Sequence, residues 1–563
     1  MTTLPSESKI GRRLLPVVID EISTYDPSRI FATIPISESL RDGFMDVTYR
    51  DFANAINRMS AWFDHEFGGK SSSFETVSYN GPPDLGYSIM TLAACKMGFK
   101  TILSSFQNKL EDQLNLLKKA ECKAMIFAEG HPINPDQIDK HGIPIVRVPT
   151  LKEMLDIGGP EPVAYTFTKT YDEAEMDPLV LLTTSGTTSV PKLVVVRHGW
   201  VSAVDRAHSV PKSNGRAPSF TVFKNRRLWS PLPAFHGGGL IGNLIIPTFS
   251  NTHSIWAPSG RPLSTTLVEE MIDHIHFDMV LLTPFIIEVV VKSDYSRSKL
   301  EKVDFVVYGG VNNTCRKAPL PRETGNRIWQ KTKLINMIGS TELSVLPTYL
   351  KDPEDWEYFY YSPDLPGIQM RPTDGDPDLY EQVIVRDPAT DPYHSTFWTF
   401  PDAEEYRVND LYAKHPSKPN LWLYIGRADD LIVLSDGKSF NPTSMEAVLR
   451  QHNYVEAAVI IGQGKLAPAA IIQFKRQVFE ELGPEYNRDS FMKDIWPCAV
   501  AANKIAPPYA HMSEDMFFLA NAEKPFRFTA KGSMMRHKTI ALYAQEIEDW
   551  YSVADGKASI AKL

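Results

Sequence analysis

The sequence lacks the features of several protein classes. Its four cysteines lie far apart without a CxxC pair, which argues against a disulfide framework or a cysteine metal site. Lys and Arg number 59 against 68 Asp and Glu, a net charge of −9, so the basic surface of a nucleic-acid-binding protein is missing. The most apolar long window, residues 277–291, contains Asp278, Pro284 and Glu288 and is too short to span a bilayer. The first residues do not resemble a signal peptide. We therefore expect a cytoplasmic protein that binds neither nucleic acid nor membrane.

The pattern of apolar residues predicts an α/β fold. Apolar residues make up 43% of the 563 residues and aromatics 11%, enough for a large core and more than one compact unit. Short apolar runs predict buried strands, and apolar spacings of three and four predict helices. The strands are expected at 123–127, 179–183, 279–282 and 303–308, and helices at 87–97 and 266–275. This alternation favours layered, largely parallel sheets with helices.

The last 130 residues or so are expected to form a separate small lobe. Residues 352–419 are rich in proline and acids and predict an irregular β segment. After Gly426-Arg-Ala-Asp-Asp, the run Thr443-Ser-Met-Glu446 fits a capping box ahead of a helix. Two strands are expected at 457–461 and 469–473. We therefore divide the chain into a core of residues 1–428 and a mobile α+β lobe of residues 429–563.

A hydroxyl-rich loop follows the predicted strand at 179–183. It reads Thr184-Ser-Gly-Thr-Thr-Ser-Val-Pro-Lys192 and can direct backbone N–H groups, hydroxyls and one ammonium toward phosphate oxygens. It lacks the glycine spacing of a Walker loop. A second glycine motif, Gly237-Gly-Gly-Leu-Ile-Gly242, matches GxGxxG, but no strand directly precedes it and no acid follows before Glu269. A dehydrogenase is therefore a remote alternative.

Five motifs in order carry a family resemblance. The loop at 184–192 is followed by Asn336-Met-Ile-Gly-Ser-Thr-Glu342, Asp410, Gly426-Arg-Ala-Asp429 and Thr529-Ala-Lys-Gly532. Together they resemble the adenylate-forming enzymes, a superfamily of acyl-CoA synthetases, luciferases and adenylation domains of nonribosomal peptide synthetases. The segments at 182–198 and 426–446 look closest to fungal synthetase-like carboxylate reductases with an adenylation, carrier and reductase layout. The resemblance covers most of the chain.

The resemblance implies a role for each motif in activating an acid with ATP and Mg²⁺. Lys531 would bridge the acid and the α-phosphate, Thr341 would contact the α-phosphate, Glu342 would bind the metal, and Lys192 would hold the leaving phosphates. Asp410 and Arg427 would hold the ribose, and the lobe would rotate about the hinge Asp429. The family's aromatic residue before the glycine of the Gly-x-Thr-Glu run is Ile338 here, and its usual Thr-Gly-Asp is Val-Asn-Asp. The candidate nucleotide-binding residues are Thr184, Ser185, Gly186, Thr187, Thr188, His236, Asn336, Met337, Gly339, Ser340, Asp410, Tyr424, Ile425, Gly426 and Arg427.

The segment around His236 resembles the family's acid pocket. Amino-acid-activating relatives place an acid here, but residues 235–247 contain none, so an α-ammonium group would be buried unpaired. Three successive glycines leave room for a flat ring, although they could instead permit close backbone packing. The candidate pocket residues are Phe235, His236, Gly237, Gly238, Pro284, Gly309, Gly310, Val345 and Leu346.

These features predict an acid–AMP ligase for an aryl acid. The acyl group would pass to the phosphopantetheine thiol of a carrier domain outside this chain, with a reductase domain following. The alternatives are a stand-alone acyl-CoA ligase, an adenylation domain for an aromatic α-keto acid, and a non-catalytic nucleotide-binding relative. The identity of the acid, the acceptor thiol and the oligomeric state stay open.

Overall fold

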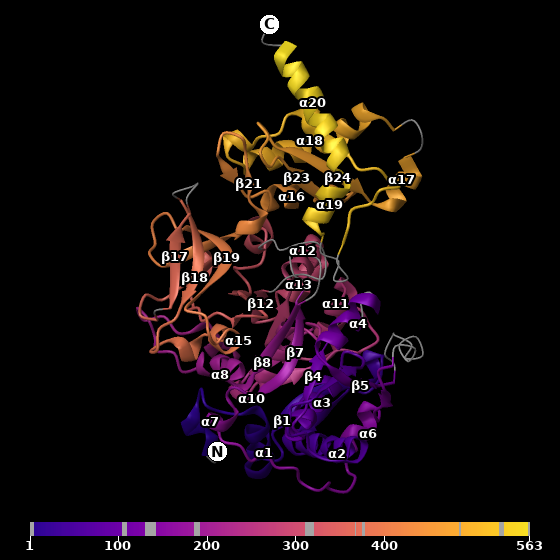
Figure 1. Cartoon of the computed structure of the whole chain (residues 1–563), viewed down its shortest axis with the longest axis vertical. Helices are drawn as coiled ribbons and strands as arrows, with labels where there is room; N and C mark the ends of the chain where they lie inside the picture. The colour runs from indigo at the N-terminus through magenta and orange to yellow at the C-terminus, as the bar shows by residue number, and fades with distance from the viewer. Residues whose placement is uncertain are drawn as a thin grey trace.

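The chain folds into a large N-terminal part and a smaller C-terminal lobe, which lie at the bottom and the top of Figure 1. The computed structural model describes residues 5–103, 110–129, 142–184, 192–309, 320–365, 367–373, 378–482, 486–528 and 534–560. The prediction of an α/β core with a small α+β lobe is confirmed.

Two mostly parallel sheets form the N-terminal part. In each, only the last pair, β7 with β8 or β1 with β2, is antiparallel. The six-stranded sheet has the order β6 (Ile145–Arg147), β5 (Cys122–Phe127), β3 (Thr76–Asn80), β4 (Lys100–Leu103), β7 (Pro178–Thr184), β8 (Lys192–Arg197). The seven-stranded sheet has the order β13 (Lys333–Met337), β12 (Phe305–Gly309), β11 (Met279–Leu282), β9 (Arg227–Trp229), β10 (His253–Ile255), β1 (Ile30–Pro35), β2 (Phe44–Thr48).

Helices connect these strands and share one large core with both sheets. α2 shows why such helices form here: Thr48 and Asp51 make a capping box, and Gly68 ends the helix with φ = 71°. The helices of this part are α1 (Leu15–Tyr25), α2 (Tyr49–Phe67), α3 (Gly86–Lys96), α4 (Leu110–Lys119), α6 (Leu151–Leu155), α7 (Tyr171–Ala174), α8 (His198–Arg206), α9 (Gly237–Leu240), α10 (Ile246–Ser250), α11 (Thr265–His274), α12 (Pro284–Lys292), α13 (Asp294–Leu300) and α14 (Arg322–Asn326). All the strands and helices predicted for this part are confirmed to within two residues.

An antiparallel sheet follows, in orange in Figure 1, where the sequence predicts an irregular β segment. In the sequence, a small hairpin of β14 (Gly339–Ser340) and β15 (Ser344–Val345) lies between the last strand of the seven-stranded sheet and the first strand of this antiparallel sheet. The short helix α15 (Thr396–Thr399) packs against α8. The five strands have the order β16 (Tyr358–Tyr360), β20 (Leu421–Arg427), β19 (Glu405–Lys414), β18 (Leu379–Val385), β17 (Ile368–Pro372).

The C-terminal lobe holds a three-stranded sheet between helices. Its elements are β21 (Ile432–Val433), β22 (Ser439–Phe440), α16 (Thr443–Leu449), β23 (Val455–Ile461), β24 (Ala469–Phe474), α17 (Arg476–Leu482), α18 (Arg488–Lys504), β25 (Phe517–Leu519), α19 (Arg536–Leu542) and α20 (Ala544–Ile560). The two predicted strands and the helix are confirmed. Across the described part of the chain, no helix is long and apolar enough to cross a membrane.

The predicted capping box at Thr443 is wrong. The N-cap of α16 is Pro442, and the Thr443 N–H donates to Asn441 Oδ1 (2.9 Å). The Glu446 carboxylate instead accepts from the Ile460 N–H (2.7 Å) and from Arg536. The Glu446 side chain, which the local pattern assigned to the cap, is therefore bound instead by strand β23 and by an arginine distant in sequence.

Candidate active site

The carboxyl end of β13 and the hairpin that follows carry the Gly-Ser-Thr-Glu motif. Thr341 and Glu342 lie in the turn between β14 and β15. Glycine is required twice for this packing: a Cβ on Gly309 would lie 2.3 Å from the Met337 carbonyl oxygen, and one on Gly339 would lie 1.8 Å from that of Ser344. The backbones of β12, β13 and the hairpin therefore approach each other more closely than other residues would allow.

The glycine helix α9 lies beside this turn. Phe235 is buried, and His236 caps the helix by accepting the Gly238 N–H at Nδ1 (3.1 Å). A Cβ on Gly237 would meet only Leu182 Cδ1 at 3.6 Å and Thr341 Oγ1 at 3.9 Å. A Cβ on Gly239 would lie 2.0 Å from the Pro233 carbonyl oxygen. Gly237 thus leaves space next to Thr341 and β7, whereas Gly239 is needed for close packing.

Asp410 and Arg427 face each other across β19 and β20. They are paired in register, and Arg427 Nη1 donates to Asp410 Oδ1 (3.1 Å) and to the Val408 carbonyl (2.8 Å). Asn409 has φ = 60°, a left-handed conformation that Asn adopts more readily than most residues after Gly. The replacement of the family's glycine by Asn409 is therefore compatible with the backbone that places Asp410.

The Tyr406 phenol is affected by charges from both the β14–β15 turn and the β19–β20 pair. Burial raises the pKa of Tyr406 to about 12, the Glu342 carboxylate and Asp410 raise it as well, and the Arg427 guanidinium lowers it. All three charged groups therefore lie close enough to act on one phenol. The structure brings together Thr341 and Glu342 from one turn, Asp410 from β19 and Arg427 from β20.

The expected nucleotide-side residues Tyr424, Ile425 and Gly426 lie on β20 next to this pair. The Tyr424 ring packs edge-on against Tyr412 at 5.6 Å between centroids, and Ile338 joins the same cluster. Gly426 has φ = 151°, and a Cβ there would lie 2.1 Å from Asn441 Nδ2. Leu346 is buried among the same aromatic side chains, half-buried Val345 pairs with Gly339, and Pro284 begins α12.

The Asn336 side chain already forms hydrogen bonds within the fold. It is buried in β13, where its amide donates to the Tyr358 carbonyl (2.9 Å) and accepts from the Lys351 ammonium. Desolvation lowers the pKa of Lys351 to about 7, against a weaker opposing effect of Asp355. The Asn336 side chain therefore ties β13 to β16, and Lys351 is a partner that no sequence motif indicated.

Several expected residues lie outside the described part of the chain. These are Ser185, Gly186, Thr187, Thr188, Gly310 and Lys531. The structure describes the residues on either side of the 185–191 and 529–533 segments. Thr184 pairs with exposed Lys192 across β7 and β8, and Phe528 bridges Met534 on either side of the Lys531 segment.

The expected hinge residue is exposed at the start of the C-terminal lobe. Asp429 lies in a short 3₁₀ turn, Ala428–Asp430, and accepts from Arg427 Nε (3.1 Å). On the other side of the turn, Arg536 Nε lies 3.7 Å from Asp430 Oδ1 and also binds Glu446. The turn is thus linked on one side to the Asp410 pair and on the other side to the lobe.

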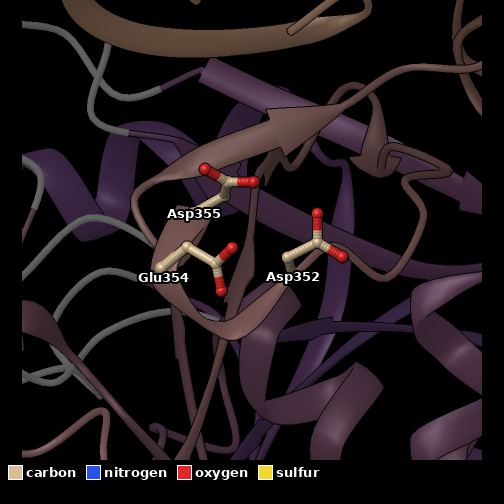
Figure 2. A group of neighbouring side chains, drawn as sticks. All are labelled: Asp352, Glu354 and Asp355. Carbon is tan, nitrogen blue, oxygen red and sulfur yellow. The ribbon is translucent and has the colours of Figure 1, made fainter.

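Three acids outside this site, Asp352, Glu354 and Asp355, lie side by side, with one carboxylate oxygen of each within 4.8 Å of the others (Figure 2). Lys418 lies between them, with Nζ 2.6 Å from Asp355, 3.5 Å from Glu354 and 3.6 Å from Asp352. Arg216 binds Asp352 as well (3.0 Å). An ammonium and a guanidinium already pair with all three carboxylates, so the cluster is an ion-pair network of the fold.

Comparison with known proteins identifies the family of this chain. The description "AMP-binding enzyme" matches residues 31–378, and "AMP-binding enzyme C-terminal domain" matches residues 429–555. The chain belongs to the AMP-binding enzymes. The predicted relationship to adenylate-forming enzymes is thereby confirmed, and with it the enzyme class of an acid–AMP ligase.

The similar proteins are fungal multidomain enzymes and bacterial ligases. The carboxylic acid reductase of Neurospora crassa is 33% identical over 97% of this chain and 51% of its own length. An isocyanide synthase–NRPS hybrid of Aspergillus fumigatus is 29% identical over 96% of this chain and 34% of its own length. This AMP-binding chain therefore spans about half the length of the reductase and about a third of the length of the hybrid. Among solved structures, a benzoate CoA ligase of Burkholderia xenovorans covers 93% of the chain with 99% of that chain matched, TM-score 0.67 and 16% identity, and so shares the fold.

Proposed function

We propose that this chain joins a carboxylic acid to AMP. The carboxylate oxygen attacks the α-phosphorus of ATP, a new P–O bond forms, and the bond to pyrophosphate breaks. The observation that carries the proposal is the Asp410–Arg427 pair (3.1 Å), with the Glu342 carboxylate near enough to act with both on the Tyr406 phenol, and Thr341 Oγ1 3.9 Å from the Cβ position of Gly237. Alignment and charge stabilisation dominate such a reaction, and these groups supply both.

The described residues fit the parts of the nucleotide. Asp410 accepts hydrogen bonds from the ribose hydroxyls, and Arg427, which already binds Asp410, adds a donor there. The Thr341 hydroxyl contacts the α-phosphate, and Lys192 at the start of β8 balances the charge of the leaving pyrophosphate. Lys531 would be brought over the site by the C-terminal lobe and neutralise charge as the carboxylate approaches.

Glu342 is the residue that fits a magnesium ion. Its carboxylate has no hydrogen bond or ion pair within the described residues, while its backbone carbonyl is bound by Thr399. A hard cation prefers carboxylate and phosphate oxygens, so Glu342 would hold Mg²⁺ together with the ATP phosphates. Bound Mg²⁺ supplies positive charge to the triphosphate. The chain's own residues then fix where the reacting oxygen and phosphorus meet.

The acid we propose is aromatic and lacks an α-ammonium group. Residues 235–247 contain no acid that could pair with an ammonium, and Gly237 leaves the room of one methyl group next to Thr341, since a Cβ there would lie 3.6 Å from Leu182 and 3.9 Å from Thr341. An unpaired buried cation would cost several kcal/mol. An aromatic α-keto acid meets the same conditions.

ATP–pyrophosphate exchange tests the proposal. A panel of aryl acids, aryl α-keto acids and α-amino acids is assayed with the chain as it stands. We expect exchange with one of the first two groups. Lys531→Ala should lower the exchange rate by on the order of 10²-fold, since it removes a charge contact made in the transition state. The control Lys538→Ala, an exposed lysine on α19, should leave the rate unchanged.

Two outcomes would contradict the proposal. Exchange with free α-amino acids and with no aryl acid would refute the substrate class. A chain that binds ATP but exchanges pyrophosphate with no acid would be the non-catalytic relative.

We further propose that the acyl group passes to the phosphopantetheine thiol of a carrier domain. The similarity to a carboxylic acid reductase of about twice this length supports the presence of further domains beside this one. A pantetheinylated carrier added in trans should accelerate acid-dependent ATP turnover more than CoA does at the same concentration. Faster turnover with CoA would identify a stand-alone acyl-CoA ligase.

A further inference from the structure

The hairpin that carries Thr341 and Glu342 is too small to hold its own shape. Each strand has two residues, and only two residue pairs are in register: Gly339 with Val345 and Ser340 with Ser344. An isolated two-stranded hairpin is marginally stable in water even when it is longer. The position of the turn therefore depends on contacts with the rest of the protein.

Two side chains from outside the hairpin bind the backbone of this turn. Trp200 Nε1–H donates to the Thr341 carbonyl (3.2 Å), and the Thr399 hydroxyl donates to the Glu342 carbonyl (2.9 Å). Trp200 lies on α8 and is completely buried, and Thr399 is the last residue of α15. The two consecutive carbonyls are thus each held by one donor.

The two donors belong to one packed unit. Ser395, just before α15, donates to the Trp200 carbonyl (2.9 Å). Arg197 Nε donates to the Trp398 carbonyl (3.0 Å), and a Cβ on Gly199 would lie 1.9 Å from Trp398 Nε1. α8 and α15 are therefore locked to each other and to β8, the strand that begins at Lys192.

We propose that Trp200 and Thr399 are positioning residues for adenylation. By holding the carbonyls of Thr341 and Glu342, they fix the direction of the Thr341 hydroxyl and of the Glu342 carboxylate relative to β8. The proposal rests on the function proposed above, in which these two groups meet the α-phosphate and Mg²⁺. Small misplacements of such groups cost large factors in rate.

The test compares two buried tryptophans, of which only Trp200 uses its indole N–H to bind the turn. Trp200→Phe removes the N–H that binds Thr341 and keeps an aromatic ring. Trp229→Phe is the matched control, since Trp229 is also buried but its Nε1 has no hydrogen-bond partner among the residues that the structure describes. We expect Trp200→Phe to lower the maximal exchange rate about tenfold, the effect of one lost hydrogen bond, and to raise the Mg²⁺ concentration for half-maximal rate several-fold. Trp200→Phe should also lose more thermal stability than Trp229→Phe, because it leaves the Thr341 carbonyl without its donor; the shift in Mg²⁺ dependence is the readout that lost stability alone would not produce.

Thr399 gives an independent arm with a conservative rescue. Thr399→Val keeps the shape and removes the donor, so it should repeat the Trp200→Phe pattern, whereas Thr399→Ser keeps the hydroxyl and should restore the rate and the Mg²⁺ dependence. Equal kinetics for Trp200→Phe and Trp229→Phe, or for Thr399→Val and Thr399→Ser, would overturn the proposal.

Calorimetric titration with Mg²⁺ and a non-hydrolysable ATP analogue separates this proposal from the proposed function. A parent chain that binds the analogue but exchanges with no acid refutes acid activation alone. The positioning role then stands if Trp200→Phe weakens Mg²⁺-dependent binding more than Trp229→Phe does, and it fails if the two bind alike. A parent that binds no nucleotide refutes both.

Discussion

Asn409 carries the backbone conformation that places Asp410. Its φ of 60° is accessible to Asn and Gly but costs other residues about 1–2 kcal/mol. We expect Asn409→Gly to keep ATP affinity, and Asn409→Ala to raise KM for ATP several-fold because the Asp410–Arg427 pair moves. The measurements are exchange kinetics and thermal unfolding.

Asn420 provides the control for this prediction. It has φ = 62° in the connection between β19 and β20, away from the paired ends that hold Asp410 and Arg427. Asn420→Ala should therefore cost similar stability and leave KM for ATP unchanged. A rise in KM for both alanine variants would show that general destabilisation, not the placement of Asp410, is responsible.

His198, the first residue of α8, makes stability depend on pH. It is buried beside Cys95 (Sγ to Nε2, 3.6 Å), and burial lowers its pKa from 6.5 to about 4, with a further lowering from Lys169. Between these values the unfolded chain binds a proton that the folded chain does not. Stability from this residue is therefore complete above pH 6.5 and is lost as pH falls toward 4.

His198 should account for about 3 kcal/mol of the loss in the parent chain by pH 4, in addition to the losses from His208 and His253, whose pKa burial also lowers to about 4. Denaturant unfolding of the parent and of His198→Gln at pH 7 and pH 4 measures it, and the variant should lose less stability over this interval. His65→Gln, at an exposed histidine, should behave like the parent. Parallel pH dependence of the parent and His198→Gln would contradict the prediction.

At the scale of elements, two glycines of α9 have different roles: Gly239 permits close packing, and Gly237 leaves room beside Thr341. Gly239→Ala would place a Cβ 2.0 Å from the backbone of Pro233, and overpacking of this kind costs about 1–3 kcal/mol or more. Gly237→Ala meets nothing closer than 3.6 Å and should leave thermal stability unchanged or slightly higher. Its methyl group would lie next to Thr341, so we expect slower exchange with bulky acids than with small ones.

Exchange rates with two acids of different size, together with melting curves, check this pair of variants. If Gly237→Ala shifts neither the rate nor the size preference, the space beside Gly237 is not part of the acid pocket. If Gly239→Ala melts like the parent, the close packing of α9 on Pro233 is not required for stability.

At the scale of the whole molecule, the turn Ala428–Asp430 joins the nucleotide side of the core to the C-terminal lobe. Adenylation and thiol transfer need different groups over one site, and a hinge of few residues can supply both arrangements. Asp429→Pro fixes φ at the hinge that we propose. We expect it to spare one half-reaction and to slow the other at least tenfold, as loss of a required conformation does.

Asp429→Ala is the control, since it removes the bond to Arg427 Nε but leaves the backbone free. It should affect both half-reactions little. Pyrophosphate exchange reports the first half-reaction, and transfer from a pre-made acyl-adenylate reports the second. Normal rates of both in Asp429→Pro would place the hinge elsewhere.

The sequence by itself determined the family and the layers of the fold. Short apolar runs and apolar spacings of three and four are local patterns, so they predicted β5, β7, β11, β12, β23 and β24 and two of the helices without knowledge of their neighbours. The ordered motifs at 184–192, 336–342 and 410–429 indicated an adenylate-forming enzyme because each needs particular side chains at short spacing.

Only the tertiary structure decided which of these side chains are available and what holds them. Trp200 binds a carbonyl 141 residues further along the chain, and Arg536 takes the Glu446 carboxylate from 90 residues away. The Asn336 amide is occupied by Tyr358 and Lys351. Hydrogen bonds between distant segments form only where packing brings donor and acceptor together, and no local pattern contains that information.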